Sequence, residues 1–267
     1  MKDELLYVNE SELPLDNIKE NGGYFAIFRK ICCIGDSLSS GEFELVKKDG
    51  TKSYHDIYEQ SWGQYISYAT NAKVYNFSKG GLSCKEFLNT YAIANDCYNL
   101  DKACQAYIIA LGVNDLFNIK VPFGTIDDID VNDENNNKDT YAGQYGAIIT
   151  KFKRISPDAK FFFVTFPNVD EGKEHNLLIE KQIKFLYDLT KIFTNSYVID
   201  LKKYGPKYDK KFKEIYYLNN HLNPLGYKLT ATIISSYIDY IIRHNYQDFK
   251  YVGLINHLNY KEVIKWD

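Results

Sequence analysis

Five short apolar segments, each rich in β-branched or aromatic residues, dominate the pattern of this sequence. They occupy residues 30–35, 73–77, 106–111, 160–166 and 196–200. Each is almost continuously apolar rather than alternating, which is typical of strands covered on both faces. Segments with helical spacing of apolar residues lie between or after them, at 55–71, 141–155, 176–194 and 224–244. Strands that alternate with helices predict a three-layer α/β/α sandwich on a five-stranded, mostly parallel sheet.

One large domain accounts for most of the length. A fold of 267 residues buries about three quarters of its unfolded surface, so it needs neither disulfides nor a structural metal. We expect this domain to span residues 29–243. Residues 1–28 are expected to form an arm packed on the core, and residues 244–267 a C-terminal extension packed on the same domain.

Charge and cysteine usage exclude several classes of function. The net charge of -3 provides no positive field for nucleic acid. The five cysteines form no CxxC pair, and no histidines stand at zinc-ligand spacing, so we expect no metal. The N-terminus is acidic and lacks a signal peptide's apolar core, and no apolar run reaches about 18 residues. We therefore expect a soluble cytoplasmic protein without a membrane partner.

Polar residues and glycines follow several of the expected strands. Ser37 comes after the first, Gly81 after the second and Asn114 after the third, while His221 follows the fifth strand and precedes the last helix. Because the carboxyl ends of parallel strands meet at one edge of a sheet, these residues should gather there. A hydroxyl, a glycine amide, a carboxamide and an imidazole are the parts of an acyl-transfer site.

The order of these residues resembles that of the SGNH hydrolases, also called the GDSL esterase/lipase family. Four blocks carry the resemblance: Gly-Asp-Ser-Leu at 35–38, Asn76 with Gly81, Gly-Val-Asn-Asp at 112–115, and His221 with Gly226. The resemblance covers about residues 29–243 and implies a flavodoxin-like SGNH hydrolase fold.

Membership of that family would assign roles to these residues. Ser37 would be the nucleophile, and His221 its general base and then the acid that protonates the leaving alcohol. The oxyanion hole would consist of the backbone amides of Ser37 and Gly81 and the side chain of Asn114. Gly80 competes with Gly81 for this role. The mechanism would use no cofactor and no metal.

Two other polar residues near these blocks have simpler interpretations. Asp36 is expected to hydrogen-bond within the turn rather than to act as a catalytic acid. His55 is expected at the surface, with the mouth of the pocket as the alternative.

One position departs from the family pattern. The family supplies its triad acid three residues before the histidine, and this position is Leu218. Three explanations remain open: a Ser–His dyad oriented by a backbone carbonyl near Leu218, an acid from elsewhere such as Asp200 as the third member, or loss of catalysis.

The resemblance implies a serine esterase that cleaves carboxylic esters through an acyl-enzyme. Its substrates would be small-molecule or carbohydrate esters with short acyl groups such as acetyl; a lysophospholipase or thioesterase is the alternative within the family. A catalytically impaired ligand-binding module is a second alternative, and a flavodoxin-like flavin binder a third. The sequence is also compatible with an oligomer.

Overall fold

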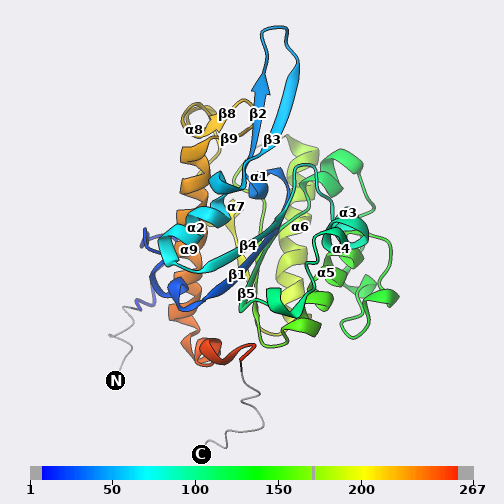
Figure 1. Ribbon diagram of the computed structural model, residues 1–267, viewed down its shortest axis with the longest axis vertical. Helices are drawn as coiled ribbons and strands as arrows, with labels where there is room; N and C mark the ends of the chain where they lie inside the picture. Colours follow the sequence, from blue (N-terminus) through cyan, green and yellow to red (C-terminus); the bar gives the residue numbers. More distant parts are fainter. Residues whose placement is uncertain (1–7, 170–171, 258–267) are drawn as a thin grey trace, which may run out of the picture.

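The sheet at the centre of the molecule is parallel throughout and has five strands. The computed structural model describes residues 8–169 and 172–257 and orders these strands β4-β1-β5-β6-β7 (Figure 1). Their bounds are β1 Lys30–Gly35, β4 Lys73–Ser78, β5 Ala106–Ala110, β6 Lys160–Val164 and β7 Ser196–Ile199. The expected α/β/α sandwich with a five-stranded parallel sheet is confirmed. Each strand begins and ends within two residues of its predicted bounds.

Helices α2 (Trp62–Thr70) and α9 (Pro224–His244) cover one face of the sheet (Figure 1). Trp62 and Ile66 of α2 pack with Ile234 and Ile238 of α9 in one buried core. The side chain of Asn223 accepts a hydrogen bond from the amide of Gly226 at 3.0 Å, so the cap of α9 stands two residues after His221.

Helices α5 (Tyr141–Ile155) and α6 (Lys173–Ile192) cover the opposite face, with the short α3 (Cys84–Glu86) and α4 (Ala92–Ala94) beside them. Tyr141, Tyr145 and Phe152 stand on one side of α5 at helical spacing and are fully buried. The ring of Phe152 lies 4.7 Å from that of Tyr107 in β5. Aromatic packing therefore joins this helix to the middle of the sheet.

The remaining α-helices and strands lie near the carboxyl ends of the sheet strands. They are α1 (Ser37–Ser40), α7 (Leu201–Tyr204), α8 (Lys210–Tyr216) and two antiparallel hairpins, β2 (Glu42–Val46) with β3 (Lys52–Asp56) and β8 (Tyr217–Leu218) with β9 (His221–Leu222). The β2–β3 hairpin projects beyond the sheet, at the top of Figure 1.

The expectation of a helix over 55–71 is wrong in its first part. Residues 52–56 pair with 42–46 instead, through a turn in which Gly50 has a φ of +84°. The helix begins only at Trp62, where the Ser61 side chain accepts a hydrogen bond from the Gln64 amide at 3.2 Å. This serine cap separates the hairpin from the helix.

The terminal segments contact the domain through their described residues. Arg243 of α9 is buried between Glu12, 2.6 Å away, and Asp239, 2.8 Å away. Phe25 and Phe249 are buried in the same core as α9. Residues 1–7 and 258–267 of the predicted arm and extension lie outside the described residues.

Within residues 8–169 and 172–257, no helix has both the length and the apolar character that a membrane span requires.

Candidate active site

A cleft of about 630 Å³ opens at the carboxyl edge of the sheet. Ser37, Gly81, Asn114 and His221 all line it. These four residues come from four separate segments of the chain, and they are the residues that the sequence pattern singles out. The structure therefore brings the expected site residues together.

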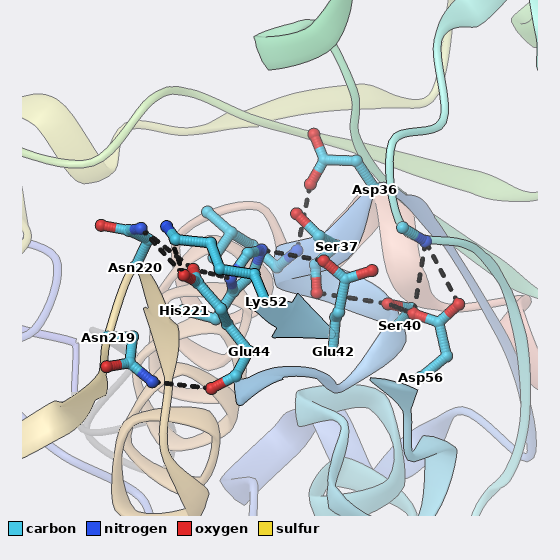
Figure 2. A network of polar contacts seen from close by, with 12 residues as sticks. Asp36, Ser37, Ser40, Glu42, Glu44, Lys52, Asp56, Asn219, Asn220 and His221 are labelled. Atoms are coloured by element: carbon cyan, nitrogen blue, oxygen red, sulfur yellow. Dashed lines mark hydrogen bonds and ion pairs between the residues drawn. The ribbon is translucent and has the colours of Figure 1, made fainter. Parts of the chain in front are cut away.

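Ser37 is the first residue of α1, which follows β1 almost directly. The carboxylate of Asp36 accepts a hydrogen bond from the amide of Leu38 at 3.1 Å, so the expected turn role of Asp36 is confirmed. The amide and hydroxyl of Ser37 make no hydrogen bond with another described residue, although its carbonyl accepts one from Ser40 at 3.2 Å. Both free groups are thus available to a ligand in the cleft (Figure 2).

Gly80 and Gly81 follow β4 and differ in what their amides do. The Gly80 amide donates to the Asp56 carboxylate, at 3.2 and 3.3 Å, and a side chain at position 80 would collide with Glu42. The Gly81 amide has no partner among the described residues. Its φ of +74° favours glycine, and the space next to its Cα is open. Gly81 is therefore the better candidate of the two for an oxyanion donor.

The side chain of Asn114 is held in one orientation by two hydrogen bonds. Its amide nitrogen donates to the carbonyl of Leu82 at 3.1 Å, and its oxygen accepts from Asn118 at 2.7 Å. An amide nitrogen carries two hydrogens, so one of them stays free for the cleft.

His221 is the first residue of β9 and stands between two glutamates. Its Nε2 lies 3.0 Å from Glu42 Oε1, and its Nδ1 lies 3.5 Å from Glu44 Oε2 (Figure 2). Burial lowers the pKa of His221, although the charge of Glu44 acts in the opposite direction. The imidazole is therefore neutral near pH 7, as a general base must be.

The two glutamates are in opposite electrostatic situations. A hydrogen bond from Lys52, with 2.6 Å between Nζ and Oε1, lowers the pKa of Glu44. Burial raises the pKa of Glu42 to about 7, with further contributions from the charges of Asp56 and Glu44. Glu44 is thus ionised at neutral pH, whereas Glu42 is partly protonated.

Neither glutamate was among the residues expected at the site. A usable signal is present: an Asp-Gly pair at 49–50 stands between residues 42–46 and 52–56, which is typical of a hairpin. On a strand, residues 42 and 44 project from the same face. Once the hairpin is recognised, two carboxylates close to the nucleophile follow from the sequence.

The structure does not bring Asp200 to the histidine. Its carboxylate caps α7, accepting from the Lys203 amide at 2.9 Å and from the Tyr187 hydroxyl at 3.1 Å. A backbone carbonyl is not the partner of His221 either, because Nδ1 makes no hydrogen bond in the described part of the chain. His55 lies exposed on β3, with Nε2 3.1 Å from Ser53 Oγ.

Metal ligands do not cluster here: within residues 8–169 and 172–257 no group of three or more His, Cys, Asp or Glu side chains could hold a metal ion.

An α/β/α sandwich with this serine, glycine, asparagine and histidine at its carboxyl edge defines the class of SGNH hydrolases, which cleave ester bonds. The model of the GDSL-like lipase/acylhydrolase family matches residues 31–234, and the chain belongs to this family. No curated protein matches the chain.

Solved structures of carbohydrate esterases share the fold. A family two carbohydrate esterase from Clostridium thermocellum, solved in complex with cellohexaose, superposes with a TM-score of 0.57 at 18% identity, over 82% of this chain and 65% of that one. A family 3 carbohydrate esterase from the same organism gives a TM-score of 0.51 at 15% identity, over 80% and 97%. A family 2 enzyme from Corynascus thermopiles gives 0.54 at 12% identity, over 86% and 69%.

The buried Asp36 should make the stability of the protein depend on pH. Burial raises its pKa from 3.8 to about 7. Between these values the folded protein holds a proton that the unfolded chain has released, so stability falls as pH rises from about 4 to 7 and stays lower above that. Replacing Asp36 by Asn removes this loss. We expect Asp36→Asn to raise the melting temperature at pH 8 by several degrees and to change it little at pH 4.

The exposed Asp127→Asn serves as the control for this measurement. Equal melting temperatures of Asp36→Asn and the wild type at pH 8 would show that the buried carboxyl carries no such cost.

Proposed function

We propose that the protein is a serine esterase that hydrolyses short-chain carboxylic esters, such as acetyl esters on carbohydrates, through an acyl-enzyme. The observation that carries the proposal is the cleft in which Ser37, Gly81, Asn114 and His221 meet. The family and the fold support the reaction class.

Acylation would begin with attack of Ser37 Oγ on the ester carbonyl carbon. As the new C–O bond forms, the hydroxyl proton passes to His221 Nε2, and the carbonyl electrons move onto the oxygen. The amides of Ser37 and Gly81 and the amide group of Asn114 would donate hydrogen bonds to this oxyanion. Collapse of the intermediate breaks the bond to the alcohol, which leaves with the proton from Nε2.

Deacylation would repeat these steps with water as the nucleophile. His221 accepts a proton from water, the hydroxide adds to the acyl carbon, and Ser37 leaves with the proton. Glu42 lies 3.0 Å from Nε2 in the resting structure. In its protonated form Glu42 donates a hydrogen bond to this nitrogen. The Glu42 side chain must therefore move away from Nε2 before the Ser37 hydroxyl can donate to the same nitrogen.

A second cavity supports a short acyl group. It is mainly apolar, has a volume of about 80 Å³, and shares Leu38 and Val113 with the cleft. A cavity about twice this size holds benzene, so about three carbon atoms beyond the carbonyl would fit. The polar side chains of Asn118 and Asn220 and the ring of Tyr54 line the other parts of the cleft, where a sugar alcohol would be recognised.

A non-catalytic ligand-binding module is the second candidate. It is favoured by the contact between Glu42 and Nε2, which occupies the nitrogen that a nucleophilic serine needs. A lysophospholipase or thioesterase would require a longer channel than the 80 Å³ cavity provides.

The nucleophile and the base are tested together. We expect Ser37→Ala and His221→Ala each to abolish hydrolysis of p-nitrophenyl acetate, because a serine hydroxyl is a poor nucleophile without a base. Ser37→Ala should also abolish labelling by a fluorophosphonate. If the wild-type protein neither turns over the ester nor takes up the label, the binding module becomes the better explanation.

Removing one oxyanion donor should slow the reaction without abolishing it. Asn114→Ala should lower kcat about 100- to 1000-fold with little change in KM, because the lost hydrogen bond forms mainly in the transition state. Asn95→Ala, an exposed asparagine on the molecular surface, is the control. A kcat of Asn114→Ala close to that of the wild type would remove Asn114 from the mechanism.

The length of the acyl chain in the substrate tests the size of the acyl cavity. Across p-nitrophenyl esters of two to twelve carbons, we expect kcat/KM to be highest between about two and five carbons and to fall at least tenfold by eight, because the cavity holds about three carbons. A maximum at ten or twelve carbons would favour the lysophospholipase or thioesterase alternative instead.

A further inference from the structure

The position where the family carries its acid is apolar in this chain and does not line the cleft. Leu218 pairs with His221 across the β8–β9 hairpin, and its side chain is 39% exposed. Its neighbours in the turn are Asn219 and Asn220, which are uncharged. This hairpin therefore provides no negative charge to the imidazole.

A carboxylate of the β2–β3 hairpin lies near Nδ1 of this imidazole. Glu44 of β2 places Oε2 3.5 Å from His221 Nδ1, and its side chain is 1% exposed. The distance is slightly longer than an ordinary hydrogen bond, and such contacts often shorten when substrate binds. Among the described residues, Glu42 is the other residue with a carboxylate oxygen within 4 Å of a ring nitrogen, and it lies at Nε2.

Three hydrogen-bonding groups hold Glu44 in place (Figure 2). Lys52 of β3 contacts Oε1 at 2.6 Å, and the side chain of Asn220 donates to Oε2 at 3.0 Å. Asn219 donates to the backbone carbonyl of Glu44 at 2.8 Å. The two asparagines between Leu218 and His221 thus fasten the hairpin that carries Glu44.

We propose that Glu44 is the positioning residue that orients His221 and stabilises its protonated form, in the place of the acid missing at position 218. The proposal rests on the serine-esterase function above. An ionised carboxylate at Nδ1 favours the tautomer that carries its proton there, which leaves the Nε2 lone pair for the proton of Ser37. When that proton arrives, the charge of Glu44 stabilises the imidazolium.

Glu42 cannot fill this role, because it contacts the wrong nitrogen. A carboxylate at Nε2 competes with the Ser37 hydroxyl and, when ionised, opposes the tautomer that the reaction needs. The two glutamates therefore have different functions although they project from the same face of β2.

The charged and titratable groups that face His221 come from both strands of the hairpin. They are Glu42 and Glu44 of β2 and Lys52, Tyr54 and Asp56 of β3. Removing the negative charge of Glu44 should lower the pKa of His221 further, because this charge stabilises the protonated ring. The acidic limb of the pH profile of kcat/KM, which reports that pKa, should then move to lower pH.

The test compares Glu44→Gln with the wild type in hydrolysis of p-nitrophenyl acetate. We expect kcat to fall by at least 100-fold, KM to change by less than about threefold, and the acidic limb to move to lower pH. Glu44→Asp, which keeps the charge on a shorter side chain, should recover part of the lost kcat. A merely structural role would lower the melting temperature and leave the acidic limb where it is.

Asp200→Asn is the matched control, because it neutralises a buried carboxylate that does not contact His221. The proposal is overturned if Glu44→Gln keeps kcat within threefold of the wild type with an unmoved acidic limb, or if Asp200→Asn moves that limb equally.

A second measurement does not depend on turnover. Long-range ¹H–¹⁵N NMR of the histidine side chains reports which ring nitrogen carries the proton and the pH at which the ring titrates. We expect the Nδ1–H form of His221 in the wild type and a lower titration midpoint in Glu44→Gln. If the titration midpoint of His221 is the same in Glu44→Gln as in the wild type, the proposal is wrong even if the enzyme is active. Absence of ester hydrolysis by the wild type, with the expected NMR shift, would instead refute the esterase function alone.

Discussion

The pairing of β1 with β4 on one side and with β5 on the other determines where the reactive groups stand. Gly35, the last residue of β1, lies opposite Ser78 of β4 and Ala110 of β5. Ser37, Gly81 and Asn114 follow these three positions by two, three and four residues, so they leave the sheet at nearly the same level. A slip in either pairing would separate the hydroxyl from its expected hydrogen-bond donors.

The β2–β3 hairpin places charged side chains next to this edge of the sheet. Its strands carry Glu42, Glu44, Lys52 and Asp56, and the histidine inserts between the first two. One lysine is not enough to neutralise three carboxylates. Lys52 contacts Glu44 rather than Glu42, and burial, with smaller contributions from the charges of Asp56 and Glu44, raises the pKa of Glu42 to about 7. The two carboxylates thereby differ in protonation state two residues apart.

Much of the fold could be predicted from the sequence, because strands covered on both faces have continuous apolar segments and the helices between them have a clear period. The helix over 141–155 has the predicted bounds for this reason. The hairpin at 42–56 was missed because its alternation is irregular and its apolar residues, such as Leu45 and Tyr54, are half exposed. Local spacing near His55 resembled a helix, but pairing with residues 42–46 across a short turn made the start of this segment a strand.

The candidate site, too, was predictable from the sequence only in part. Ser37, Gly81, Asn114 and His221 were predictable, because short motifs encode them. The partner of His221 was not, because Glu44 and His221 are far apart in the sequence and are connected only by the packing of two hairpins. Asp200 had the right residue type and a place at the end of a strand, but the first turn of α7 uses its carboxylate.

The hydrogen bonds between the β8–β9 hairpin that carries His221 and the β2–β3 hairpin join residues 175 and 176 positions apart in the sequence. Closing so long a loop costs more entropy than forming a helix, so we expect these contacts to form late in folding. A partly folded chain could therefore contain most of its helices and much of its sheet while its imidazole stands alone in solvent. Catalytic competence would then appear late in refolding, after the circular dichroism signal has recovered, because it requires contacts between parts of the site that are far apart in the sequence.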